Sequence, residues 1–145
     1  MRDKAFVDTN IWLYALFTNA TQDLRNSQAK QFLSGLVRPC LSTQVIRETC
    51  SNLMKKANTP ESTIQALLTG WYRDCEVIES SLAQSLLASR LRQDYRFSYW
   101  DSHVVAAALD GGCTKLYSED MQHGLVVENI LVIQNPFLSF GIEGH

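Results

Sequence analysis

Short apolar runs alternate along the chain with longer stretches in which apolar residues recur at helical spacing. The short runs predict five strands, at residues 5–8, 39–42, 75–78, 115–118 and 130–134. The longer stretches predict six helices, at residues 11–17, 24–36, 43–57, 59–68, 81–92 and 100–109. Strands and helices that alternate in this way are typical of an α/β fold with a central parallel sheet of about five strands.

Capping signals set two of the helix boundaries. Thr59 and Pro60 form a typical helix start, with the threonine as the N-cap and the proline at the first helical position. We expect that helix to end near Gly70. Ser81 and Gln84 have the spacing of a capping box, which predicts another helix start at Ser81.

The size and charge of the chain limit the number of domains and the partners that we expect. A chain of 145 residues suits one domain, and we expect a single domain over residues 1–145. Its 13 basic and 15 acidic residues give a formal net charge of −2, which offers no overall attraction for nucleic acid. Local basic patches would have to hold a polyanion, and the candidates are Lys55, Lys56, Arg90, Arg92 and Arg96. A solvated helix end is the simpler explanation for each of these residues taken alone.

The cysteines indicate a reducing environment. Cys40, Cys50, Cys75 and Cys113 are not paired at the spacing of zinc ligands, so we expect small core residues in a cytoplasmic protein. We expect no signal peptide before the first predicted strand. No apolar run approaches the roughly 18–20 residues of a membrane span, so no membrane partner is expected.

Four acidic residues at the junctions of predicted elements are the main clue to function: Asp8, Glu48, Asp101 and Asp120. Asp8 and Asp120 follow strands directly, and ligands of parallel sheets bind beyond the carboxyl ends of the strands. Carboxylates that converge there repel one another and need a cation.

Each of the four acids also has a structural explanation. Asp8 could be the N-cap of the next helix, although Asn10 could serve as that cap and leave Asp8 free. Asp120 suits a turn, and Asp101 suits a cap. Asp101 shares a helical face with Val104 and Val105, where a buried charge would be costly without a partner, so we favour a site there.

Glu48 is the weakest candidate by pattern. It lies nearly opposite the apolar stripe of its helix, which predicts a side chain facing solvent. The histidines His103, His123 and His145 are expected at the surface and form no competing site. The sequence has no glycine-rich phosphate loop. A phosphoacceptor domain of the receiver type would need a lysine at a late strand end, whereas Lys115 begins its strand.

The segments that carry these acids resemble the PIN-domain family, and in particular its VapC-type toxin ribonucleases. The resemblance extends from residue 4 to about residue 136 and rests on Phe6-Val7-Asp8-Thr9-Asn10, on residues 41–48, on Tyr99-Trp100-Asp101-Ser102 and on Tyr117-Ser118-Glu119-Asp120. It implies a three-layer α/β/α sandwich and metal-dependent hydrolysis of RNA. It also implies a catalytic role for all four acids, and it alone brings Glu48 into the site.

The resemblance further implies a cation and a set of supporting residues. Carboxylates are hard oxygen ligands suited to Mg²⁺ or Mn²⁺. We expect Asp8, Asp101 and Asp120 to bind the cation directly and Glu48 to bind it directly or through water. Ser118, Thr9 and Asn10 are expected to support these ligands. Gln122 stands where many family members carry another acid, which leaves the number of metal ions open.

The resemblance implies RNA as substrate, a protein antitoxin and a homodimer. The segment 11–17, with Trp12 and Tyr14, could contribute to an interface or belong to the core. Two other functions stay open: an RNA-processing nuclease without an antitoxin, and a non-catalytic binding module with the PIN shape.

Overall fold

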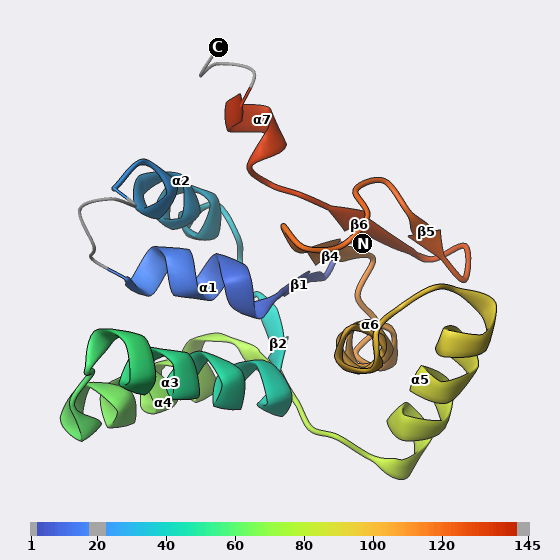
Figure 1. The fold of residues 1–145 in the computed structure, drawn as a ribbon, viewed down its shortest axis with the longest axis horizontal. Helices are drawn as coiled ribbons and strands as arrows, with labels where there is room; N and C mark the ends of the chain where they lie inside the picture. The colour runs from blue at the N-terminus through green and yellow to red at the C-terminus, as the bar shows by residue number, and fades with distance from the viewer. Residues whose placement is uncertain (1–2, 18–22, 142–145) are drawn as a thin grey trace.

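The computed structural model describes residues 3–17 and 23–141. The strands are β1 (Ala5–Val7), β2 (Cys40–Ser42), β3 (Glu76–Ile78), β4 (Lys115–Tyr117), β5 (Val126–Val127) and β6 (Leu131–Gln134). The helices are α1 (Thr9–Leu16), α2 (Asp23–Ser34), α3 (Thr43–Ala57), α4 (Glu61–Asp74), α5 (Leu82–Asp94), α6 (Tyr99–Asp110) and α7 (Leu138–Gly141) (Figure 1).

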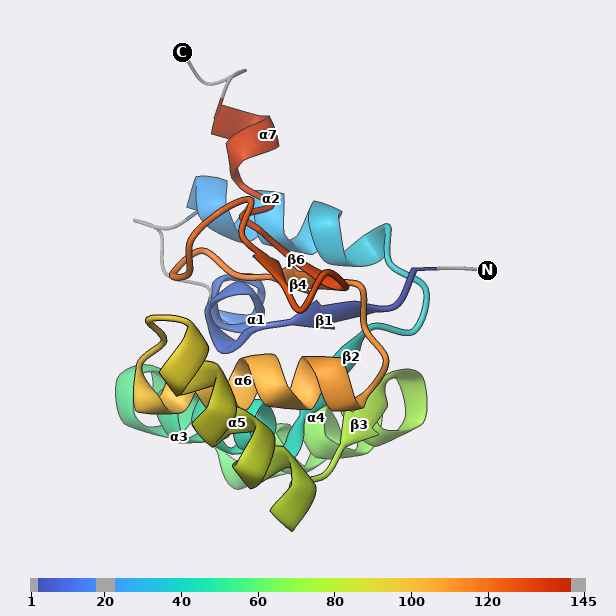
Figure 2. The ribbon, with the colours of Figure 1, turned by 90° about the vertical axis from the view of Figure 1, so that its right-hand side faces the viewer.

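The strands form one six-stranded sheet in the order β3-β2-β1-β4-β6-β5. Neighbours pair in parallel except β5, which runs antiparallel to β6. Helices α1 to α4 lie on one side of the sheet, and α5 and α6 lie on the other (Figures 1 and 2). The prediction of an α/β fold with helices on both faces of a central, mostly parallel sheet is confirmed.

Strand β5 and helix α7 were not predicted from the sequence. Val126–Val127 is too short to show a strand period. The turn that follows uses Glu128 and Asn129, whose φ angles of 53° and 56° are positive, and it brings the Ile130 N–H to the Val127 carbonyl at 3.0 Å. Two consecutive positive φ angles are typical of a hairpin turn that matches strand twist.

Helix α4 differs from its prediction at both ends. It begins at Glu61, and Pro60 is its N-cap without a side-chain hydrogen bond. The Thr59 hydroxyl donates instead to the Leu53 carbonyl at 3.0 Å, at the end of α3. The helix continues through Gly70 to Asp74 because the next residue, Trp71, is buried in the core, and this packing outweighs the low helix propensity of glycine.

The predicted start of α5 at Ser81 is confirmed in part. The Ser81 hydroxyl accepts from the Gln84 N–H at 3.1 Å, as an N-cap should. No hydrogen bond joins the Ser81 N–H to the Gln84 side chain oxygen, so the reciprocal half of the capping box is not seen between these two described residues. The Gln84 side chain is directed elsewhere, since its amide donates to the Glu79 carbonyl and to Asp110 Oδ2.

The aromatic residues of α1 pack in the core or against it. Trp12 is buried and meets Trp71 edge to face, with ring centroids 6.0 Å apart. Its Nε1–H donates to the Val7 carbonyl at 3.1 Å. The Tyr14 ring packs against Phe137, and its hydroxyl donates to Glu119 Oε1. Trp12 therefore belongs to the core, whereas Tyr14 is half-buried against it, and the contribution of segment 11–17 to an interface stays a prediction.

The cysteines are free, and Cys40, Cys75 and Cys113 are buried, as expected. Cys50 is only half-buried. None of the helices in the described part of the chain is long and apolar enough to span a membrane.

Candidate functional site

All four acidic residues line one small, open pocket of about 180 Å³ where β1 and β4 end. They come from separate segments: Asp8 follows β1, Glu48 lies in α3, Asp101 in the first turn of α6, and Asp120 after β4. The rest of the lining consists of Thr9, Asn10, Leu13, Gln44, Trp100 and Val104. None of these residues carries a positive charge.

Asp8 is both the N-cap of α1 and the most deeply buried of the four acids, with only 7% of its surface exposed. Its Oδ1 accepts from the Thr9 N–H at 2.8 Å, and its Oδ2 accepts from the Ser118 hydroxyl at 2.9 Å. The expectation that Asn10 would be the better cap is wrong, since Asn10 lies within the first turn. Capping does not exclude a site role, because a carboxylate has further acceptor positions on both oxygens.

The environment of Asp8 opposes its ionisation. Burial raises the pKa of Asp8 from 3.8 to about 6. The hydrogen bonds from Thr9 and Ser118 act in the opposite direction, and the charges of Asp101 and Asp120 raise the pKa further. Among the described residues, the carboxylate therefore has hydrogen-bond donors but no positively charged neighbour.

Ser118 and Asn10 connect the end of β4 to α1. The Asn10 amide donates to Asp120 Oδ2 at 3.0 Å and to the Ser118 hydroxyl at 3.3 Å. Its Oδ1 accepts from the Glu119 N–H at 3.2 Å, and the Ser118 hydroxyl accepts from the Asp120 N–H at 3.2 Å. Asp120 is exposed to solvent but is tied to the Asp8 side of the pocket by this network.

Glu48 reaches the pocket from the flank of α3. It is half-buried, its Oε1 accepts from the Gln44 amide at 3.0 Å, and its Oε2 lies 3.4 Å from the Thr9 hydroxyl. The prediction of a solvent-facing side chain is wrong. A helical wheel separates the side facing the sheet from the opposite side, but the flank of α3 faces α1.

Asp101 is half-buried beside the packed face of α6. Ser98 is the N-cap of this helix and accepts from the Asp101 N–H at 3.1 Å, so Asp101 itself is not the cap. Burial raises the pKa of Asp101, the Ser98 hydrogen bond lowers it, and the charges of Asp120 and Glu48 raise it. Val104 and Val105 on the same face are buried, as predicted.

The family match decides the relationship of this chain to known proteins. The model of the PIN domain matches residues 5–126. The chain belongs to the PIN domain family. No curated protein matches it.

Solved structures of toxin proteins share the fold of this PIN domain. A toxin–antitoxin complex from Klebsiella pneumoniae has 20% identity and a TM-score of 0.68, covering 92% of this chain and 98% of that one. VapC20 of Mycobacterium tuberculosis, a toxin that cleaves the sarcin–ricin loop, has 18% identity and a TM-score of 0.65, covering 81% and 92%. DNA-bound VapBC from Salmonella typhimurium has 15% identity and a TM-score of 0.64, covering 93% and 99%. At these identities the likeness shows the fold alone.

The acidic pocket of this PIN domain suits a hard cation by its donor chemistry. Within residues 3–17 and 23–141, no three Asp, Glu, His or Cys side chains are close enough to form a complete ligand set by themselves. Mg²⁺ does not need such a set, because it keeps several waters and usually takes one or two carboxylates together with substrate phosphate oxygens. An open pocket lined by four oxygen-bearing acids fits that requirement.

Glu119 and the described histidines, which were not expected to be ligands, do not line the acidic pocket. Glu119 turns away from it to Tyr14 and forms a salt bridge with Arg25 at 3.3 Å. His123 is exposed, as expected, whereas His103 is half-buried, contrary to expectation. His145 lies outside the described residues. The last turn of α3 carries Lys55 and Lys56, and Arg90 and Arg96 are exposed on and after α5.

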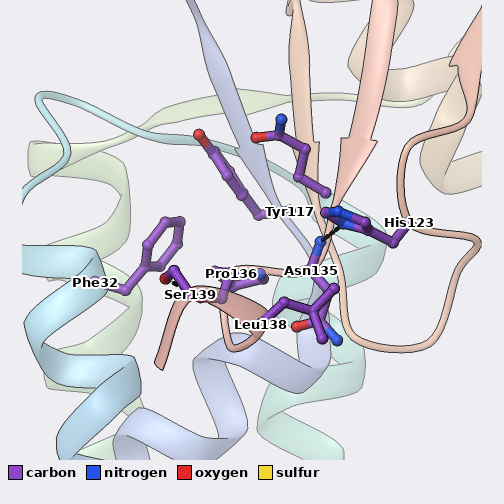
Figure 3. Close-up of a pocket in the computed structure, with 8 residues that line it drawn as sticks. Phe32, Tyr117, His123, Asn135, Pro136, Leu138 and Ser139 are labelled. Carbon is purple, nitrogen blue, oxygen red and sulfur yellow. Dashed lines mark hydrogen bonds between the residues drawn. The ribbon is translucent and has the colours of Figure 1, made fainter. Parts of the chain in front are cut away.

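A larger cavity of about 450 Å³ lies beside the ends of β4 and β6 (Figure 3). Phe32 and Tyr117 form part of its wall, with ring centroids 4.7 Å apart, and the His123 Nδ1 accepts from the Asn135 N–H at 3.0 Å. None of the residues that line it is acidic, so it lacks the chemistry of the acidic pocket. Sequence reasoning missed Gln44 and Trp100 as pocket residues, since neither type signals a site by itself.

Proposed function

We propose that this PIN domain is a metal-dependent endoribonuclease of the toxin type. One observation carries the proposal: four carboxylates from four separate segments line one open pocket that contains no positive side chain. Such an arrangement is unfavourable for stability alone and suits a divalent cation. Nuclease activity in the PIN family and the fold shared with VapC toxins support the same function.

Asp8, Asp101 and Asp120 would hold Mg²⁺ or Mn²⁺, one or two of them directly and the others through metal-bound water, and Glu48 would be a further ligand directly or through water. When bound, the cation would orient the scissile phosphate and lower the pKa of a water molecule for in-line attack. Ser118 orients the Asp8 carboxylate and stabilises its ionised form, and Asn10 positions Asp120. Thr9 supports Asp8 through its N–H and approaches Glu48 with its hydroxyl.

Partners are proposed on the same basis. RNA would be the substrate, and a protein antitoxin would cover the acidic pocket in the inactive state. Structures with the same fold include toxin–antitoxin complexes, which supports such a partner. A homodimer and a cytoplasmic location complete the proposal.

A nuclease assay with matched variants tests the activity. The purified protein should cleave RNA with Mg²⁺ or Mn²⁺, and a chelator should abolish cleavage. Asp8→Asn and Asp101→Asn should each lower the rate by more than about 100-fold, since even the loss of a residue that supports a ligand typically costs about 10–100-fold. Asp74→Asn is the control because it removes an exposed carboxylate of α4 that does not line the acidic pocket. Equal cleavage by all four proteins would refute the assignment.

Expression in cells separates the toxin from the other functions. Wild-type protein should arrest growth and create new RNA ends, and Asp8→Asn should do neither. Sequencing those ends identifies the substrate. Cleavage without growth arrest would favour an RNA-processing nuclease, and no new ends would favour a binding module.

A further inference from the structure

Two large aromatic side chains are exposed at the start of α6. Trp100 is 62% exposed and Tyr99 is 54% exposed, although they are neighbours in the first turn of a packed helix. Their rings meet edge to face with centroids 5.1 Å apart. Exposed aromatic rings that adjoin a pocket are unusual for a structural role and are typical of binding surfaces.

The two rings are held in place by neighbouring side chains. The His103 ring lies 4.6 Å from that of Tyr99, and we call Tyr99, Trp100 and His103 the aromatic platform. The Arg92 guanidinium lies 4.8 Å from the centre of the Tyr99 ring. Its Nη1 donates to the Ser102 hydroxyl at 2.7 Å, which fastens α5 to α6. Arg92 therefore places a positive charge over the Tyr99 ring of the platform and links this ring to α5.

The platform adjoins the acidic pocket directly. Trp100 is part of the pocket lining and immediately precedes Asp101, so the two Cα atoms are about 3.8 Å apart. Figure 2 shows the first turn of α6 on the side of the molecule where β1 ends and α1 begins. A group that stacks on Trp100 therefore lies beside the carboxylates.

The charge of the protein gives little Coulomb attraction for RNA, which favours base stacking as a means of binding. The net charge is −2, and the residues that line the pocket contribute acids but no positive side chain. Coulomb attraction to phosphates is thus weak apart from the cation itself. Stacking of a base on an aromatic ring does not depend on net charge and works for every base. Only unpaired bases expose a face for it.

We propose that Trp100 binds the RNA substrate by stacking on an unpaired base next to the scissile phosphate. Tyr99 and Arg92 support the ring that receives the base. This inference rests on the proposed nuclease function and adds the side chain that positions the substrate base beside the carboxylates.

Binding measurements in the Asp8→Asn background test the inference without cleavage. The probes are a short single-stranded oligoribonucleotide and the duplex it forms with its complement, both with Mg²⁺. Trp100→Leu keeps an apolar side chain without a π face and should weaken single-strand binding roughly 5- to 100-fold. Trp100→Phe should retain most of the affinity. The control is Tyr72→Leu, which removes another exposed aromatic ring on α4.

Two further readouts identify stacking specifically. Trp12 and Trp71 are buried, so quenching of tryptophan emission by RNA should come from Trp100 and disappear in Trp100→Phe. An abasic nucleotide at one position should weaken binding to the Asp8→Asn protein and have no added effect with Trp100→Leu. That loss of additivity would couple the ring to one base.

Each outcome has a distinct meaning. Equal single-strand binding by Trp100→Leu would overturn the inference and leave the nuclease assignment in place. Unchanged RNA binding with loss of antitoxin binding would also overturn it and make the platform a protein-docking surface. No binding of the single strand at all would overturn the inference, and cleavage by the wild type would then decide the nuclease assignment separately. RNA binding through Trp100 without cleavage by the wild type would keep the inference and refute the nuclease.

Discussion

Among the residues that the structure describes, charged side chains form a salt bridge at one end of the sheet and lack a partner of opposite charge at the other. At the end where β1 begins, Lys4 Nζ donates to Glu76 Oε2 at 2.9 Å and to the Gly111 carbonyl at 2.6 Å. At the other end, Asp8 is buried beside other acids. In the described part of the chain, none of the four pocket acids forms a salt bridge.

The pKa directions express the same contrast. The hydrogen bond to Glu76 raises the pKa of Lys4, which shows that its charged form is stabilised. Burial raises the pKa of Asp8 to about 6, which shows that its charged form is destabilised. An uncompensated charge in an otherwise well-packed fold indicates a functional constraint at that end of the sheet.

The largest expected effect is on stability without metal. The pKa of Asp8 is about 6 in the folded state, against the ordinary 3.8. Its contribution to the free energy of unfolding is therefore full below about pH 4 and is lost as the pH rises through 6. In a chelator at pH 7.5, Asp8→Asn should therefore raise the free energy of unfolding by up to about 3 kcal/mol. The gain should shrink at pH 4.5, as measured by urea unfolding. A destabilised variant at pH 7.5 would show that the contrast between the ends is wrong.

Cation binding should offset the repulsion between the pocket carboxylates and stabilise the folded protein. Mg²⁺ or Mn²⁺ at about 100 times its dissociation constant should stabilise the wild type by about 2.7 kcal/mol. Thermal unfolding with and without a chelator measures this gain. Lys4→Met should gain as much as the wild type, whereas Asp8→Asn and Asp101→Asn should gain much less. The same gain in all proteins would place the cation elsewhere.

Loss of the Ser118 hydroxyl should lower RNA cleavage although all four pocket acids remain. Ser118→Ala leaves Asp8 Oδ2 without its donor at 2.9 Å, so RNA cleavage should fall about 10–100-fold. Thr49→Val is the matched control, because it removes another fully buried hydroxyl, which donates to Val45 within α3. Similar activity losses in the two variants would indicate a general packing effect.

The smallest effect should come from loss of the Lys4–Glu76 salt bridge, at the end of the sheet where β1 begins. Lys4 and Glu76 are each 40% exposed, so solvent screens their salt bridge. Lys4→Met should lower the free energy of unfolding by about 1 kcal/mol or less, and the loss should diminish at high salt. RNA cleavage should not change. A change in cleavage would contradict the separation of the two ends.

The sequence predicted most of the fold because its periodic segments are long or strongly apolar. The strands around β1 and the helix Thr43–Ala57 follow directly from such patterns. Val126–Val127 is too short for a pattern, and the length of α4 depends on the burial of Trp71 in the core. Local propensity at Gly70 cannot include that long-range contact.

The sequence by itself determined that carboxylates follow β1 and β4, because the strand ends and the acids are both visible in the chain. Only the tertiary structure decided that Glu48 faces Thr9, that Asp8 is also the cap of α1, and that Trp100 adjoins the acids. The physical reason is that periodicity reports which side of an element is buried. The partner of each flank depends on how the helices pack over the sheet.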